Sequence, residues 1–288
     1  MKKLFVLLCL FAFVGWSDNR AESVSSSSAF LDEVLDSQTD EMKARYQFRN
    51  PKKTLEFFGI ERGMTVVEVL PGSKGWYTKL LVPFLGSEGS LVGANYALGV
   101  YSLFGFEGER LEKMASWPQS WPADIKETLQ SSDGAKIQGF MLGEMPESLN
   151  GTADAVLLIR ALHNLARFES QGAFLSSALK NTYDVLKPGG IVGIVQHHAR
   201  EEMSDEWADG SKGYLKRGFV IQLMTDAGFE LVGSSDHNQN VKDQPTEEDV
   251  VWRLPPSLGT SKDNDELRKS MLSIGESNRM TLKFKKPI

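Results

Sequence analysis

The chain has 288 residues, of which 41% are hydrophobic, and a formal net charge of -6 at pH 7. This length and apolar content suffice for one sizeable hydrophobic core, whereas an acidic balance without a basic run argues against nucleic acid as a partner. The single cysteine, Cys9, excludes an internal disulfide framework.

The N-terminal segment has the form of an export signal. Lys2 and Lys3 precede an apolar run from Leu4 to Val14, which is too short to span a bilayer comfortably and is typical of a secretory signal peptide. We expect cleavage after Ser17, a periplasmic or extracellular location, and no stable membrane anchor afterwards. A retained amphiphilic anchor is the alternative.

The predicted signal covers residues 1–17, a serine-rich linker covers residues 18–29, and a single domain of residues 30–288 follows. The linker contains the low-complexity stretch Ser23 to Ser28. Short helical patterns follow from Phe30 to Leu35 and from Pro51 to Phe58.

The most informative stretch runs from Met64 to Thr78. A β-branched and aliphatic run, Thr65 to Leu70, is broken by Pro71 and Gly72, and a helical pattern then extends from Trp76 to Leu85. A strand, a tight turn and a helix in this order place the turn where open α/β sheets bind their ligands. The alternative is an ordinary connection between a strand and a helix.

Strands and helices alternate through the rest of the chain. Further strands are expected at Ser90 to Asn95, Ala135 to Met141, Asp154 to Arg160, Ile191 to Gln196, Gly228 to Val232 and Arg279 to Lys285, with later helices at Gln171 to Val185 and Ser211 to Ala227. This alternation predicts a right-handed, doubly wound α/β sheet.

Two motifs carry a family resemblance. Glu68-Val-Leu-Pro-Gly resembles the first motif of class I S-adenosylmethionine-dependent methyltransferases, and the longer string from Val66 to Thr78 resembles an exported bacterial group of predicted methyltransferases. Leu186-Lys-Pro-Gly-Gly resembles the pattern that precedes the fifth strand of that family. The resemblance implies a Rossmann-like, seven-stranded, mostly parallel sheet with an antiparallel last strand and helices on both faces.

The resemblance also implies S-adenosylmethionine as the cofactor and indicates which residues would bind it. They are Glu68, Leu70, Pro71, Gly72, Ser73, Gly75, Trp76 and Tyr77 around the first turn, Asn95 after the second strand, Glu144 after the third and Arg160 after the fourth. Leu70 stands where the family has its first glycine, and Lys74 disturbs the position of the third. Asn95 replaces the usual acid and would bind ribose hydroxyls more weakly.

The candidate catalytic residues are His163 and His198. His163 would act as a base at the rim of the sheet, or fill a structural role. His197 and His198 point to opposite faces of a strand, so they cannot share a metal ion, and we expect no metal. His198 is expected to line the substrate side, with capping of the strand end as the alternative. Arg160 would hold a carboxylate of the cofactor or of a substrate, unless it pairs within the protein.

The aromatic-rich insertion from Tyr101 to Trp121 is expected either to cover the cleft or to pack as an amphipathic helix on the sheet. The predicted function is methyl transfer from S-adenosylmethionine to an unidentified small-molecule or protein acceptor. The alternative is a non-catalytic, exported protein that binds a small molecule on the same scaffold. A nicotinamide-dependent reductase is disfavoured because G-x-G-x-x-G is missing.

Overall fold

A computed structural model describes residues 27–130 and 133–288, so the predicted signal segment lies outside the described residues. At its centre is an eight-stranded sheet in the order β3-β2-β1-β4-β5-β8-β7, with the two-residue β6 paired to β5 beside this path. The strands are β1 Thr65–Val69, β2 Ser90–Asn95, β3 Lys136–Met141, β4 Ala153–Ile159, β5 Leu186–Ala199, β6 Leu215–Lys216, β7 Glu230–Ser235 and β8 Arg279–Lys285.

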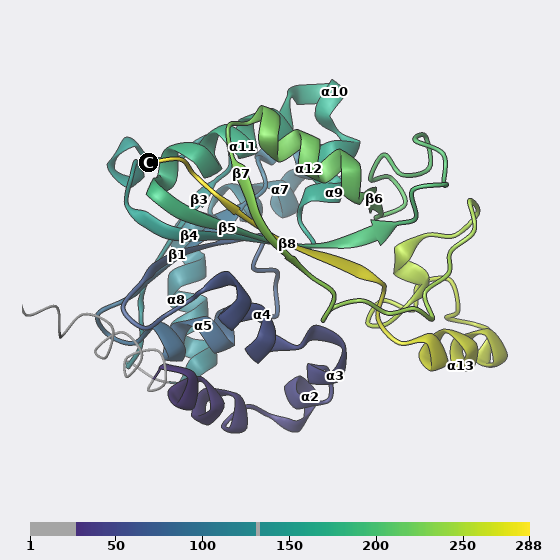
Figure 1. Cartoon of the computed structure of the whole chain (residues 1–288), viewed down its shortest axis with the longest axis horizontal. Coiled ribbons are helices and arrows are strands. Elements are labelled where there is room, and N and C mark those ends of the chain that lie inside the picture. The colour runs from purple at the N-terminus through teal and green to yellow at the C-terminus, as the bar shows by residue number, and fades with distance from the viewer. Residues whose placement is uncertain (1–26, 131–132) are drawn as a thin grey trace, which may run out of the picture.

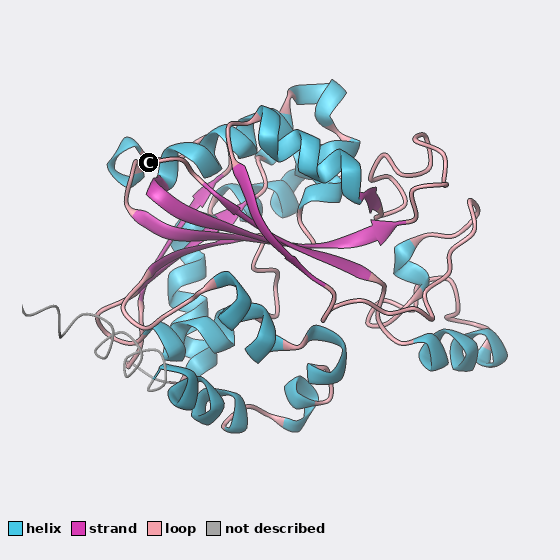
Figure 2. Ribbon diagram, in the orientation of Figure 1, coloured by secondary structure: helices cyan, strands magenta, loops and turns pink. Residues whose placement is uncertain are grey.

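Helices cover both faces of the sheet (Figures 1 and 2). After a helical segment at 27–36 come α2 Asp40–Lys43, α3 Tyr46–Arg49, α4 Pro51–Phe58, α5 Thr78–Leu85, α6 Leu98–Leu103, α7 Gly108–Ala115, α8 Trp117–Leu129, α9 Leu162–Arg167, α10 Glu169–Gly172, α11 Phe174–Val185, α12 Arg217–Asp226 and α13 Asp265–Ile274. Two short 3-10 helices span Glu147–Leu149 and Val251–Arg253. Within the described ranges, no helix has the length and apolar character needed to cross a membrane.

The strand order confirms the predicted architecture. β1 to β5 are parallel, and β8 runs antiparallel between β5 and β7. The chain therefore has the Rossmann-like fold of class I methyltransferases. Because β8 is antiparallel, its first residue, Arg279, pairs with His197 near the end of β5. Both residues consequently lie at the edge where the parallel strands end.

The two faces of the sheet bury separate hydrophobic clusters. Leu175 and Leu179 of α11 belong to one cluster, and Phe58 of α4 and Leu80 of α5 belong to the other. In Figure 1, α11 and α12 lie above the sheet and α4, α5 and α8 below it. Burial of such apolar side chains, worth about 1.5–3 kcal/mol each, is what holds the helices to the sheet.

The aromatic insertion packs on the sheet at its α8 end. Trp117 and Trp121 stack with ring centroids 4.9 Å apart and lie over the strand glycines Gly93 and Gly139. A Cβ atom at Gly93 would lie 2.6 Å from the Trp121 ring, so the missing side chain is what admits the indole. These two tryptophans therefore pack on the sheet as in an amphipathic helix, and they do not form a lid over the cleft.

Three helix starts differ from the sequence prediction. The helix expected from Gln171 divides at Ala173, which adopts a left-handed conformation with φ 52°, so α11 begins at Phe174. The helix expected from Ser211 begins at Arg217 because Leu215 and Lys216 pair with the end of β5 as β6. The first helix after the glycine turn begins at Thr78 rather than at Trp76.

Candidate functional site

A pocket of about 280 Å³ lies at the edge of the sheet where β1, β4 and β5 end and β8 begins. One side is formed by the turn from Leu70 to Gly72, by Arg160 and His163 after β4, and by His197 of β5. Ser277 and Arg279 line it from the start of β8, and the segment from Val251 to Ser257 forms the opposite wall. We call this cavity the arginine–histidine pocket.

Two residues of the pocket have a left-handed backbone. Leu70 has φ 54° and Arg160 has φ 59°, and they follow β1 and β4, which are neighbouring strands. Their amides donate to Ala94 and Val195 of the adjacent strands, at 2.8 and 2.7 Å, which fixes both turns. A non-glycine residue in this conformation costs about 1–2 kcal/mol, and such strain clusters at functional sites.

A buried ionic cluster lies behind the pocket. Glu276 is 1% exposed in its side chain and forms ion pairs with Arg45, Arg49 and Arg279. Burial alone would raise the pKa of Glu276, but the arginines outweigh it and hold that pKa at about 2. Glu276 is therefore ionised at neutral pH and is shared by three guanidinium groups.

Arg160 extends this cluster into the pocket. Its guanidinium forms no side-chain hydrogen bond or ion pair with any other described residue, although its field reaches Glu276 and Arg279. Burial, and then repulsion from Arg279, lower the pKa of Arg160 to about 10. Arg160 remains a cation at neutral pH, so the pocket contains a charge with no ion-pair partner in residues 27–130 and 133–288.

Two histidines face each other in the pocket, with ring centroids 5.4 Å apart. The side-chain amide of Gln196 lies 3.4 Å from His163 Nδ1, and Ser277 Oγ lies 2.5 Å from His197 Nδ1. Burial lowers the pKa of His163 to about 4 and that of His197 well below its ordinary value. Both imidazoles are consequently neutral at pH 7 and can donate or accept a hydrogen bond.

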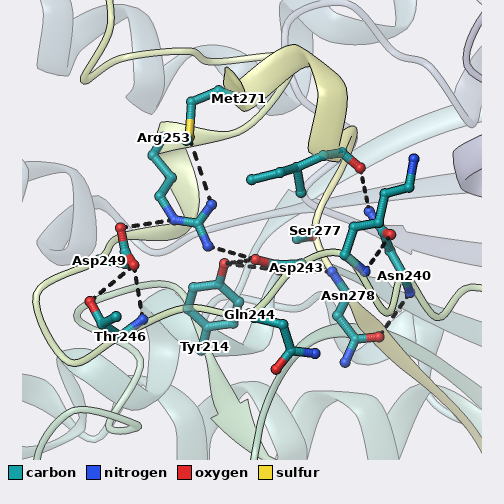
Figure 3. A network of polar contacts seen from close by, with 12 residues as sticks. Tyr214, Asn240, Asp243, Gln244, Thr246, Asp249, Arg253, Met271, Ser277 and Asn278 are labelled. Atoms are coloured by element: carbon teal, nitrogen blue, oxygen red, sulfur yellow. Dashed lines mark hydrogen bonds and ion pairs between the residues drawn. The ribbon is translucent and has the colours of Figure 1, made fainter. Parts of the chain in front are cut away.

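The wall opposite the strands is held by a second polar network, shown in Figure 3. Arg253 pairs with Asp243 at 2.7 Å and with Asp249 at 3.1 Å. Asp243 also accepts hydrogen bonds from the Tyr214 hydroxyl at 3.0 Å and from the backbone N–H of Asn278 at 2.9 Å. This network fixes the segment that carries Trp252 and Leu254 into the pocket, and it ties that segment to the start of β8.

The structure brings five of the predicted site residues together in the pocket: Leu70, Pro71, Gly72, Arg160 and His163. Ser73 is exposed on the turn. Glu144 belongs to a separate hollow of about 200 Å³. The two histidines at the end of β5 diverge as expected for a strand, but it is His197, not His198, that lines the pocket.

The remaining residues of the first motif are occupied within the protein. Glu68 is 4% exposed and accepts a 2.7 Å hydrogen bond from Thr78 Oγ1 at the start of α5. Burial raises the pKa of Glu68 to about 7. The Trp76 ring lies 4.5 Å from the guanidinium of Arg49, and the Tyr77 hydroxyl donates to the backbone oxygen of Arg49. Gly75 lies beside Thr78, with an ideal Cβ 3.2 Å from that side chain.

The position implied for the cofactor ribose is also occupied. Asn95 is 4% exposed, and its side-chain oxygen accepts hydrogen bonds from the Tyr96 amide at 2.9 Å and the Tyr101 hydroxyl at 2.5 Å. Asn95 does not line the arginine–histidine pocket, whereas the Leu70 side chain stands at its edge. The residues in this arrangement do not fit an adenosyl group that extends from the glycine turn to Asn95.

A metal centre has no support among the described residues, which contain no group of three histidine, cysteine or acidic side chains able to hold an ion. The sequence prediction missed His197, Trp252 and Arg279 as pocket residues. Trp252 and Arg279 come from segments late in the chain, where the spacing of residues does not indicate a site. For His197, strand alternation predicted that only one histidine of the pair faces the pocket, but not which one.

Comparison with known proteins agrees with this fold. No protein-family model and no curated protein match the chain. Among solved structures, the [4+2]-cyclase SpnF is similar with a TM-score of 0.52 and 15% identity, over 83% of this chain and 80% of the cyclase. At this identity the likeness shows the fold and not the reaction.

Methyltransferase structures are similar at lower scores. A SAM-dependent methyltransferase from Aquifex aeolicus has a TM-score of 0.45 and 15% identity, over 72% of this chain and 92% of that chain. An arsenic(III) S-adenosylmethionine methyltransferase from Chlamydomonas reinhardtii has a TM-score of 0.44 and 14% identity, over 90% of this chain and 73% of that chain.

Proposed function

We propose that the protein binds a small polar molecule in the arginine–histidine pocket, on a methyltransferase scaffold. The observation that carries the proposal is that Leu70 and Arg160, at the ends of adjacent strands, both adopt strained left-handed conformations and both line this pocket. Open α/β sheets bind ligands at this edge. We extend the proposal to export, on the basis of the predicted signal peptide.

The pocket offers complementary groups for such a molecule. Arg160 provides a guanidinium, His163 and His197 provide neutral imidazoles, and Trp252 provides an aromatic surface. A few convergent polar groups in a partly apolar cavity are typical of a site for a small molecule. The volume of about 280 Å³ suits a compact metabolite.

Methyl transfer from S-adenosylmethionine is the second candidate. The observation in its favour is the turn itself: Gly72 has φ 69°, and an ideal Cβ there meets no atom within 4 Å, so backbone is open beside the pocket. Against it stands the Asn95 position, where the Tyr96 amide and the Tyr101 hydroxyl already bind the side-chain oxygen. Binding without methyl transfer therefore accounts for more of the geometry.

Native mass spectrometry of the purified protein tests the proposal. We expect the wild type to retain a small molecule that Ser257→Trp, at the mouth of the pocket, no longer retains. Ser270→Trp is the matched control, since Ser270 is exposed on α13. Equal retention by Ser257→Trp, or no retained mass in the wild type, would contradict the proposal.

Isothermal titration with S-adenosylmethionine separates the two candidates. The binding proposal predicts no heat at millimolar S-adenosylmethionine for either the wild type or Ser257→Trp. Saturable heat in the wild type that Glu68→Ala abolishes would instead support methyl transfer. Because Glu68 does not line the pocket, the same substitution should not abolish retention of the native ligand.

A further inference from the structure

The lining of the arginine–histidine pocket has an imbalance of charge. It contains two arginines, Arg160 and Arg279, and no carboxylate. The carboxylates whose fields reach Arg160 are Glu276, which already pairs with three other arginines, and Glu68, which is bonded to Thr78. Four arginines thus share two carboxylates in this region, which leaves a positive surplus at the pocket.

The two pocket arginines differ in what they contact. Arg279 is held within the protein, because each of its three side-chain nitrogens donates a hydrogen bond: to Glu276, to Ser277 Oγ and to the backbone oxygen of Phe48. Arg160 has no such partner among the described residues. Arg160 is only partly buried, so the N–H donors of its guanidinium are free to bind a molecule that enters the pocket.

The backbone conformation of Arg160 also indicates a binding role. Its φ of 59° is one that glycine adopts without strain, and glycine would also remove the unpaired charge. Arginine here carries a backbone strain that glycine would not, so the position is not optimised for stability. Strain and unpaired charge at one residue are instead typical of a site built to bind.

We propose that Arg160 binds an oxyanion, a carboxylate or a phosphate group, of the molecule that occupies the arginine–histidine pocket. The inference rests on the function proposed above and adds the chemical class of the ligand. The planar guanidinium fork suits bidentate binding of either group. The imidazoles of His163 and His197, neutral and side by side, can donate further hydrogen bonds to the same anion.

Titration with acetate and with inorganic phosphate, each at constant ionic strength, tests the inference by calorimetry. We expect saturable binding to the wild type, weakened on the order of tenfold or more in Arg160→Gln and partly preserved in Arg160→Lys, which keeps the charge but not the fork. Arg268→Gln is the matched control, because Arg268 is exposed on α13 and lies outside the pocket lining. Tighter binding of acetate assigns a carboxylate, and tighter binding of phosphate assigns a phosphate.

Arg160→Gly tests whether Arg160 has a structural role only. It should bind neither anion yet melt at a higher temperature than the wild type, since it removes backbone strain and an unpaired charge. A lower melting temperature for Arg160→Gly together with unchanged anion binding by Arg160→Gln would overturn the inference. If mass spectrometry finds a retained neutral molecule that Arg160→Gln still binds, this inference fails while the proposed function stands; if the wild type binds neither anion and retains no molecule, both fail.

Discussion

The hydroxyl of Tyr101 donates a 2.5 Å hydrogen bond to the side-chain oxygen of Asn95, at the position where the family resemblance implies a cofactor ribose. Tyr101 is 9% exposed and comes from α6, the first helix of the aromatic insertion. The insertion therefore contributes a side chain to the cofactor position as well as two tryptophans to the sheet face. The chain has a methyltransferase fold, and at this position its own side chains bind the Asn95 oxygen.

The contact between Tyr101 and Asn95 can be measured as stability. Tyr101→Phe keeps the ring but removes the hydroxyl, so we expect the free energy of unfolding to fall by about 0.5–1.5 kcal/mol. Urea denaturation measures this change. Tyr183→Phe is the control, because Tyr183 packs against Phe229 through its ring. A change no larger than that of the control would mean that the hydrogen bond adds nothing to stability.

The ionic cluster around Glu276 should be essential for folding. Glu276→Gln leaves Arg45, Arg49 and Arg279 without their shared carboxylate, and removing one partner from a buried ionic group costs about 3–5 kcal/mol. Chemical denaturation at pH 7 checks this loss. Glu144→Gln, at an exposed carboxylate, is the matched control and should leave stability unchanged within about 0.5 kcal/mol.

The same cluster predicts the acid limit of stability. Because the pKa of Glu276 is about 2 in the folded protein and 4.5 ordinarily, its stabilising contribution is fully present above pH 4.5. It is lost as the pH falls from 4.5 toward 2. In Glu276→Gln this part of the acid destabilisation should be missing, and an unchanged slope of stability against pH in that range would contradict the assignment.

Glu68 should change stability with pH in the opposite direction to Glu276. Burial raises the pKa of Glu68 to about 7 from 4.5, so the folded state favours the protonated carboxyl, and stability declines as the pH rises from 4.5 through 7. Glu68→Gln removes this penalty and should be more stable than the wild type at pH 8, by up to about 3 kcal/mol, with a smaller difference at pH 5. Thermal denaturation at the two pH values measures it, and an equal difference at both would show that ionisation of Glu68 plays no part.

The packing of α8 on the sheet depends on a glycine. Gly93→Ala would place a Cβ 2.6 Å from the Trp121 ring, and overpacking of this kind costs about 1–3 kcal/mol. Gly218→Ala, near the start of α12, is the control because its Cβ would approach only Glu201, at 3.6 Å. If Gly93→Ala is as stable as the control, the indoles do not rest on the strand as described.

The sheet could be predicted from the sequence because each strand is specified by residues that are neighbours in the chain. Runs such as Thr65 to Leu70 and Ile191 to Gln196 are mostly apolar, have turn residues next to one end and alternate with helical patterns, which predicts a parallel sheet. Element ends were less predictable. Ala173 breaks a helix through a left-handed backbone that alanine does not signal, and β6 exists only because it pairs with β5.

The site was predictable only where it lies next to a strand end. The turn from Leu70 to Gly72, Arg160 and His163 follow β1 and β4 directly, so the position of each strand located them. Trp252 and Ser277 reach the pocket through tertiary contacts, in which Asp243 joins Arg253 to Asn278 across the late loops. That Tyr101 contacts Asn95 likewise follows from packing and not from spacing.

A crystal structure of the natively purified protein, grown without added carboxylates, phosphate or S-adenosylmethionine, tests the central claim most directly. The claim predicts electron density for a compact molecule in the arginine–histidine pocket, in contact with Arg160, while the Tyr101 hydroxyl remains on Asn95. Density for an adenosyl group that runs from Gly72 past Asn95, with Tyr101 displaced, would contradict it.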